Sequence, residues 1–216
     1  MKWPRASGIL AHPTSLPGRF AVGDLGLGTL DFLDFLVASG QRIWQTLPLG
    51  PTGYGDSPYS LLSAFAGNPL LISPESLLSE RLLDEDDLAD APVFNPATVD
   101  YVAARGWKTH VLRRSYQRFQ HYQDAALSET FQAFCDDQRD WLDDYALFMA
   151  LKSHFDGTAW TDWPRPYAGR DPEALASART TLADEVAFHR YTQFLFFRQW
   201  AELRAQAHAR DIRIMG

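Results

Sequence analysis

The first 48 residues alternate between apolar runs and a helical pattern, and this alternation restricts the possible folds. Ser7 to Ala11 (SGILA) is a short apolar run, and the loop HPTSLPG that follows is rich in proline and glycine. In GTLDFLDFLVASG the apolar residues recur at helical spacing, and Gly40 suits a helix end. Ile43 to Leu47 favours a second strand, which Pro48 ends. Strand, helix and strand in this order predict a βαβ unit with parallel strands.

The rest of the chain is mainly helical in pattern. Helices are predicted over 100–122, 128–138, 140–155 and 177–211, and short acidic helical turns over 73–91. The centre of the last helix, Val186 to Leu203, is apolar on nearly every side, which predicts deep burial. NPLLIS (68–73) is compatible with a short strand, and residues 157–174 are predicted to be a loop. IRIMG (212–216) begins another strand.

These elements predict an α/β fold that opens a (β/α) architecture with about three parallel strands. Residues 1–68 hold the first strands and their loops, 69–175 a mainly helical insertion, and 176–216 a further helix and strand. A closed parallel barrel needs eight strands and about 250 residues. We therefore expect an N-terminal part of a longer protein. Expressed alone, the 216 residues are expected to aggregate or bind hydrophobic dyes, because the apolar strands lack neighbours.

Charge and composition exclude several classes of function. The net charge is −7 and no long basic run occurs, so nucleic acid is not an expected partner. No stretch approaches the roughly 18–20 apolar residues of a membrane span, and residues 1–20 lack the apolar core of a secretory signal. Cys135 is the only cysteine and is predicted to be a buried thiol. The sequence thus predicts a cytoplasmic protein.

Polar and aromatic side chains follow both N-terminal strands. Loops at the carboxyl ends of parallel strands form the active face of a (β/α) barrel. The second loop, LPLGPTGYGDSPYS, combines prolines, glycines, tyrosines, hydroxyls and one carboxylate, which suit a polyhydroxylated ring. The candidate site residues are His12, Tyr54, Asp56, Ser57 and Tyr59. From the residues alone, Asp56 and Ser57 also fit simple turn formers, and His12 fits a loop residue held by backbone.

Cofactor motifs are missing from the sequence. GYGDSP is not followed by the Gly-Lys-Ser/Thr of a nucleotide loop, and no cysteine or histidine pattern has zinc spacing. The acidic runs LDEDD and CDD lack the spacing of a calcium loop. We therefore predict neither a nucleotide-binding loop nor a metal site.

Several ordered segments together resemble the 4-α-glucanotransferases (amylomaltases or disproportionating enzymes, glycoside hydrolase family 77). They are RASGILAHPTSLPG, GQRIWQTLPLGPTGYGDSPYS, SAFAGNP, DWLDDYALFMALK, EVAFHRYTQFLFFRQW and IRIMG. The resemblance implies a TIM barrel with helical insertions. It also implies transfer of 1,4-α-glucan segments to a new 4-position of an acceptor glucan or glucose, by a retaining double displacement without a cofactor.

The resemblance also assigns roles to residues. It makes Ser57 and Tyr59 sugar contacts near the scissile bond, Tyr54 a more peripheral sugar platform, and Asp56 part of the glucan-facing loop. Arg105 stands where relatives can carry an aromatic residue. The catalytic carboxylates of the family are expected downstream of Gly216, so this chain is expected to hold no catalytic residue and to be inactive alone.

Two alternatives stay open at this point. One is a non-catalytic α-glucan-binding fragment or module, which holds glucan without chemistry. A glycan hydrolase would use the same carboxylate pair as a transferase. Only the acceptor preference of an intact enzyme separates hydrolysis from transfer.

Overall fold

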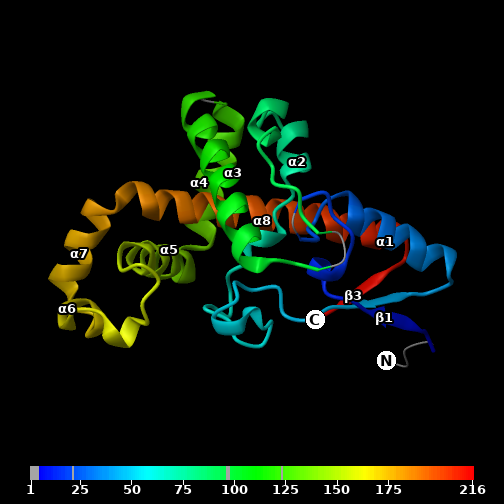
Figure 1. The fold of residues 1–216 in the computed structure, drawn as a ribbon, viewed down its shortest axis with the longest axis horizontal. Coiled ribbons are helices and arrows are strands. Elements are labelled where there is room, and N and C mark those ends of the chain that lie inside the picture. Colours follow the sequence, from blue (N-terminus) through cyan, green and yellow to red (C-terminus); the bar gives the residue numbers. More distant parts are fainter. Residues whose placement is uncertain (1–4, 21, 96–97, 123) are drawn as a thin grey trace. The chain divides into compact units, whose positions relative to one another are not determined.

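The computed structural model describes residues 5–20, 22–95, 98–122 and 124–216 (Figure 1). It divides into two compact units, residues 1–122 with 195–216 (unit 1) and residues 123–194 (unit 2). Unit 1 contains strands β1 (Gly8–Leu10), β2 (Ile43–Gln45) and β3 (Arg213–Met215), and helices α1 (Leu27–Ala38), α2 (Pro74–Ser79) and α3 (Tyr101–Tyr122). Unit 2 contains α4 (Ala125–Asp137), α5 (Arg139–His154), α6 (Arg165–Ala168) and α7 (Pro172–Thr181). Helix α8 (Ala183–Ala209) begins in unit 2 and ends in unit 1.

The three strands form one parallel sheet in the order β1-β2-β3, which confirms the predicted βαβ unit and the third strand. β1 and β3 come from opposite ends of the described chain, and Figure 1 shows the blue and red arrows close together. Trp44 in the central strand is fully buried, and its Nε1 donates a hydrogen bond to the carbonyl of Ala11 at 2.8 Å. On the outer strands, Leu10 and Met215 remain 56% and 52% exposed.

Helix α1 forms where the helical pattern predicts it and ends at the predicted glycine. Leu33 and Leu36 are fully buried and hold the helix to the core. Gly40 has φ +71°, a left-handed conformation that glycine adopts without a steric penalty. The Gly40 amide donates to the carbonyl of Val37, and the Gln41 amide donates to that of Leu36. These bonds end the helix and direct the chain into β2.

A buried network of charged and polar groups supports unit 1. Lys108 Nζ of α3 lies 2.8 Å from Asp24 Oδ2 and donates to the carbonyl of Ile72 at 2.6 Å. The lysine side chain is 1% exposed and that of the aspartate 9%. The other carboxylate oxygen accepts a hydrogen bond from the Gly26 amide at 3.0 Å, just before α1. One ion pair therefore joins α3, the segment before α1 and the segment before α2.

Three local predictions need correction. NPLLIS is not a strand, because the side chain of Asn68 caps a 3-10 helix, η3 (Pro69–Leu71), by accepting from the Leu70 amide. The predicted loop over 157–174 includes η5 (Trp160–Asp162), α6 and the start of α7. The single helix predicted over 177–211 is two helices, α7 and α8, which are separated at Leu182.

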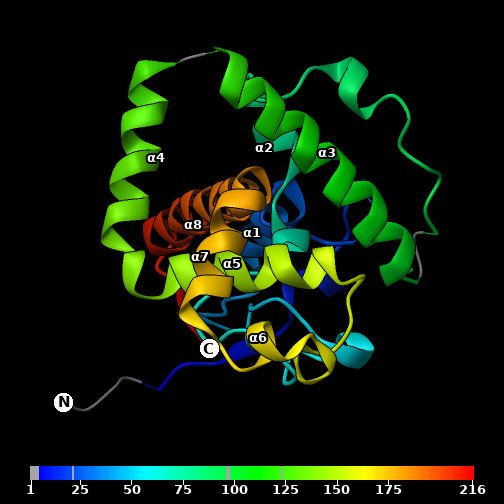
Figure 2. The same ribbon diagram turned by 90° about the vertical axis from the view of Figure 1, so that its left-hand side faces the viewer.

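Unit 2 has its own small apolar core. Residues of α5 and α7 pack with Trp163 and with Val186 of α8. Figure 2 shows α5, α6 and α7 grouped together, in agreement with the contacts of α7 with both α5 and α6. The expected burial of Cys135 in α4 is confirmed, and burial raises the pKa of its thiol to about 11.

Candidate functional site

The candidate site lies in the two loops that follow β1 and β2, and His12 joins these loops. Its Nδ1 lies 2.7 Å from Thr14 Oγ1 and accepts a hydrogen bond from the Thr14 amide at 3.3 Å. Its Nε2 lies 3.4 Å from the carbonyl oxygen of Pro48, which follows β2. This arrangement matches a neutral ring that donates from Nε2. Burial lowers the pKa of His12, while the hydrogen bond to Pro48 opposes that shift.

The lowered pKa of His12 predicts a pH dependence of stability. Below the ordinary pKa of 6.5 the unfolded chain binds a proton that the folded ring resists, so stability falls as pH drops through 6.5. Replacing His12 by Asn keeps an acceptor for the Thr14 amide and removes the titrating group. We expect His12→Asn to flatten the change in urea midpoint between about pH 7.5 and about pH 5.5. If the urea midpoint changed equally with pH in parent and variant, the neutral, half-buried ring would be contradicted.

The loop after β2 is a short hairpin held by its own backbone. Thr52 and Leu61 form an antiparallel bridge, the Gly53 amide donates to the carbonyl of Ser60 at 2.7 Å, and the Leu62 amide donates to that of Pro51 at 2.9 Å. At the tip, Gly55 and Asp56 have φ of +75° and +51°. These bonds and the two left-handed residues give the loop a defined shape.

The hairpin presents its tyrosines to solvent. Tyr54 is 98% exposed and Tyr59 is 75% exposed. Large aromatic side chains are usually well buried, so two exposed rings within six residues make this hairpin a candidate binding surface. Ser57 is half-buried, and its Oγ accepts a hydrogen bond from the Tyr59 amide at 3.3 Å. The serine thus helps to fix the backbone that carries the second tyrosine.

Asp56 forms an ion pair that the sequence did not predict. Arg105 near the start of α3 donates from Nη2 to Asp56 Oδ1, and the hydroxyl of Thr52 donates to the same oxygen at 3.3 Å. The arginine and aspartate side chains are 48% and 26% exposed. A carboxylate held in this way anchors the hairpin to α3. No local pattern identifies such a pair, because 49 residues separate its members.

The site combines aromatic faces, hydroxyls and a fixed charge, which are groups that can bind and orient a polyhydroxylated ligand. Within the described residues, no group of three or more histidine, cysteine, aspartate or glutamate side chains is placed to hold a metal ion. In the same part of the chain, no helix has both the length and the hydropathy needed to cross a bilayer.

Comparison with known proteins assigns the family. Residues 11–216 match the family model described as 4-alpha-glucanotransferase. The chain belongs to the 4-α-glucanotransferase family. A relative from Thermus thermophilus, named 4-alpha-glucanotransferase, is 49% identical over 216 residues, which are 100% of this chain and 42% of that protein. A Synechocystis relative of the same name is 48% identical over 212 residues, 98% of this chain and 42% of that protein.

A solved structure shares the fold of this 4-α-glucanotransferase-family chain. Amylomaltase from Streptococcus agalactiae, solved in complex with acarbose, matches with a TM-score of 0.92 and 37% identity. The match covers 98% of this chain and 42% of that one. The chain therefore spans about 42% of the length of these relatives. The family resemblance expected from the sequence motifs is confirmed.

Proposed function

We propose that the protein transfers segments of a 1,4-α-glucan to a new 4-position of an acceptor glucan or of glucose. The observation that carries this proposal is the rigid hairpin after β2, inside the family match, with Tyr54 and Tyr59 exposed. The similar amylomaltase from Streptococcus agalactiae is a complex with acarbose, which supports a carbohydrate ligand. The partners would be maltooligosaccharides, starch or glycogen chains, and glucose, in the cytoplasm.

In this proposal the two loops form one wall of the glucan site. Tyr59 and Ser57 contact sugar near the scissile bond, and Tyr54 offers a more peripheral platform. Asp56 holds the hairpin to α3 through Arg105, and His12 holds the loop after β1 against Pro48. Each role follows from exposure or partners: the tyrosine rings are open to a ligand, whereas Asp56 and His12 already bind protein groups.

We propose a retaining double displacement for the reaction. One carboxylate attacks the anomeric carbon while a second, about 5–5.5 Å away, protonates the departing oxygen. The 4-hydroxyl of an acceptor sugar then displaces the enzyme carboxylate and gives its proton to the second carboxylate. We assign neither role to Asp56, the one carboxylate of the hairpin, because it is engaged with Arg105 and Thr52. This chemistry needs neither a metal nor an organic cofactor, since carboxylates supply both nucleophile and proton.

The sheet and helices fit the same proposal at the level of the fold. We propose that the three parallel strands belong to a TIM barrel, whose active face lies at the carboxyl ends of the strands. Residues 1–68 would supply strands and glucan-facing loops, 69–175 a helical insertion, and 176–216 a barrel helix and the next strand.

The test is to incubate the natural full-length protein with maltotriose. Transfer produces glucose together with maltooligosaccharides longer than the substrate, whereas hydrolysis produces only shorter sugars. Glucan binding without any product would favour a binding module instead. The 216 residues alone are expected to form no product. If they did form longer maltooligosaccharides, the expectation that they lack the catalytic carboxylate pair would be wrong.

A further inference from the structure

We propose that unit 2 carries a second α-glucan-binding site, in a cavity bordered by α5, η5, α6 and α7. This inference goes beyond the proposed function, which concerns the loops after β1 and β2, and rests on it only for the identity of the sugar. The cavity has a volume of about 280 Å³. Ligand pockets commonly range from about 300 to 1,000 Å³, so this one suits a small group such as a single sugar ring.

The floor and one wall of the cavity are rigid and apolar. Leu147 and Leu151 of α5 line it and are buried. Trp163 is 7% exposed, and its Nε1 donates to the carbonyl of Thr158 at 3.1 Å. Its ring centroid lies 5.6 Å from that of Phe148 and 5.5 Å from that of Phe155. These contacts hold Trp163 in the core of unit 2, so its ring is not available to stack on a sugar.

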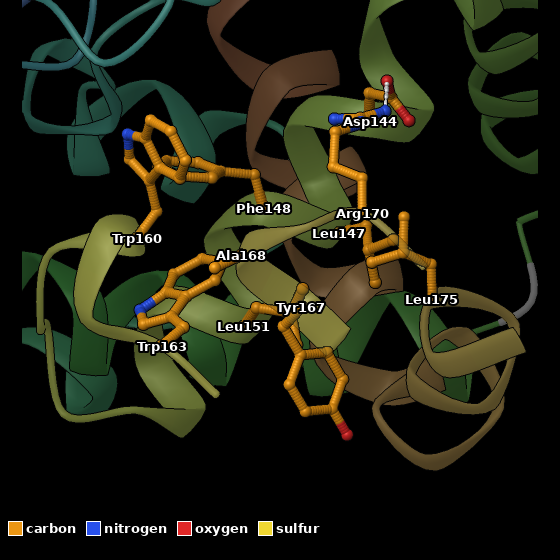
Figure 3. Close-up of a pocket in the computed structure, with 10 residues that line it drawn as sticks. All are labelled: Asp144, Leu147, Phe148, Leu151, Trp160, Trp163, Tyr167, Ala168, Arg170 and Leu175. Carbon is orange, nitrogen blue, oxygen red and sulfur yellow. Dashed lines mark hydrogen bonds and ion pairs between the residues drawn. The ribbon is translucent and has the colours of Figure 1, made fainter. Parts of the chain in front are cut away.

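Trp160 is far more exposed than Trp163, three residues later. Its side chain lines the same cavity but remains 55% exposed. Figure 3 shows both indoles on one side of the cavity, across from Asp144 and Arg170. An exposed tryptophan beside a preformed hollow offers a flat apolar face, on which the C–H face of a pyranose ring can stack.

The opposite rim supplies hydrogen-bonding groups. Arg170 Nη2 lies 2.7 Å from Asp144 Oδ2, and Arg179 Nη2 lies 3.6 Å from the other carboxylate oxygen. Arg170 and Asp144 are 67% and 53% exposed, so their free donors and acceptors can reach sugar hydroxyls. One aromatic face with a facing polar pair is the arrangement that recognises a sugar ring, which is apolar on its faces and polar at its edge.

Arg170 occupies a position where glycine would be more favourable. It follows α6 and has φ +56°, the left-handed conformation that commonly ends a helix with glycine. Replacement by glycine therefore removes the rim group without a conformational penalty. Arg81, with φ +61° after α2, offers the same substitution outside the proposed site. Arg81→Gly is thus a control matched in charge and backbone conformation.

The natural full-length protein can be tested by its retardation in native gels containing amylopectin. We expect Trp160→Ala to weaken retention about threefold to tenfold, the effect of losing one aromatic contact. Arg170→Gly should weaken retention and keep or raise the thermal midpoint, whereas Arg81→Gly should leave retention unchanged. Normal retention by both Trp160→Ala and Arg170→Gly would overturn the site. Weaker retention of Arg170→Gly supports the proposed site even if Trp160→Ala folds poorly.

A second measurement separates this site from the one after β2. If the sites are independent, the loss from Trp160→Ala adds to the loss from Tyr59→Ala in the double variant. No further loss on a Tyr59→Ala background would overturn a second site. If Trp160→Ala weakens retention but the parent protein forms no products from maltotriose, only the proposed transferase function is contradicted. If the parent protein forms these products but Trp160→Ala leaves retention unchanged, only the second site is contradicted.

Discussion

Replacing Lys108 by methionine is expected to lower the free energy of unfolding by about 3–5 kcal/mol. The lysine is 1% exposed and neutralises Asp24, whose side chain is 9% exposed. Without the lysine, Asp24 remains buried with a charge and no cation, and the carbonyl of Ile72 loses its donor. Desolvation makes such an orphaned group far more costly than the loss of a surface ion pair.

Urea denaturation of parent and variant, with m-values compared, would measure this effect. Lys152→Met is the matched control, because Lys152 is half-buried and donates to the carbonyl of Gly157 at 2.7 Å, with an expected cost of about 1 kcal/mol. Asp24→Asn combined with Lys108→Met should recover part of the loss, since the amide keeps an acceptor for Gly26. Equal costs for the two lysine variants would show that the ion pair does not support unit 1.

Tyr59→Ala is expected to lower kcat/KM for glucan transfer by about tenfold to hundredfold in the natural full-length protein. The ring is 75% exposed on a hairpin whose backbone is fixed, so its removal takes away stacking and one hydroxyl and leaves the fold intact. Each tenfold corresponds to about 1.4 kcal/mol, and the proposed loss equals one aromatic contact and one hydrogen bond.

Initial rates of glucose release from maltotriose would provide the measurement. Tyr54→Ala is the control, because Tyr54 lies on the same hairpin, is 98% exposed and has the peripheral role only in our proposal. Its effect should be smaller than that of Tyr59→Ala. A larger effect for Tyr54 would reverse the two assignments, and unchanged kinetics for Tyr59→Ala would remove Tyr59 from the site.

Local patterns predicted much of the secondary structure. The strands, α1 and α3 follow from hydrophobic periodicity, and Gly40 ends α1 in the predicted way. The failures were also local. The apolar run after Asn68 matches a strand in composition, but a side-chain cap on the Leu70 amide favours a 3-10 turn. The break at Leu182 interrupts a helical pattern that contains neither glycine nor proline there.

The candidate site was predictable in its position but not in its contacts. Turn residues located the hairpin, and the order of strand and loop placed it after β2. Its tie to Arg105 and the link between His12 and Pro48 were not predictable, because each joins segments at least 36 residues apart. The buried role of Lys108 was equally hidden, since a lysine in a polar helix pattern is normally solvated.

The sequence by itself determined the family, the three strands with the helix between the first two, and the position of the candidate glucan loop, because motifs, periodicity and turn residues act over short stretches of chain. Only the tertiary structure decided that Asp56 and Lys108 are engaged in ion pairs, and that Trp160 stays exposed while Trp163 is buried. Ion pairing and burial depend on side chains from segments that are distant in the sequence but close together in the folded chain. Two tryptophans only three residues apart can therefore differ strongly in burial.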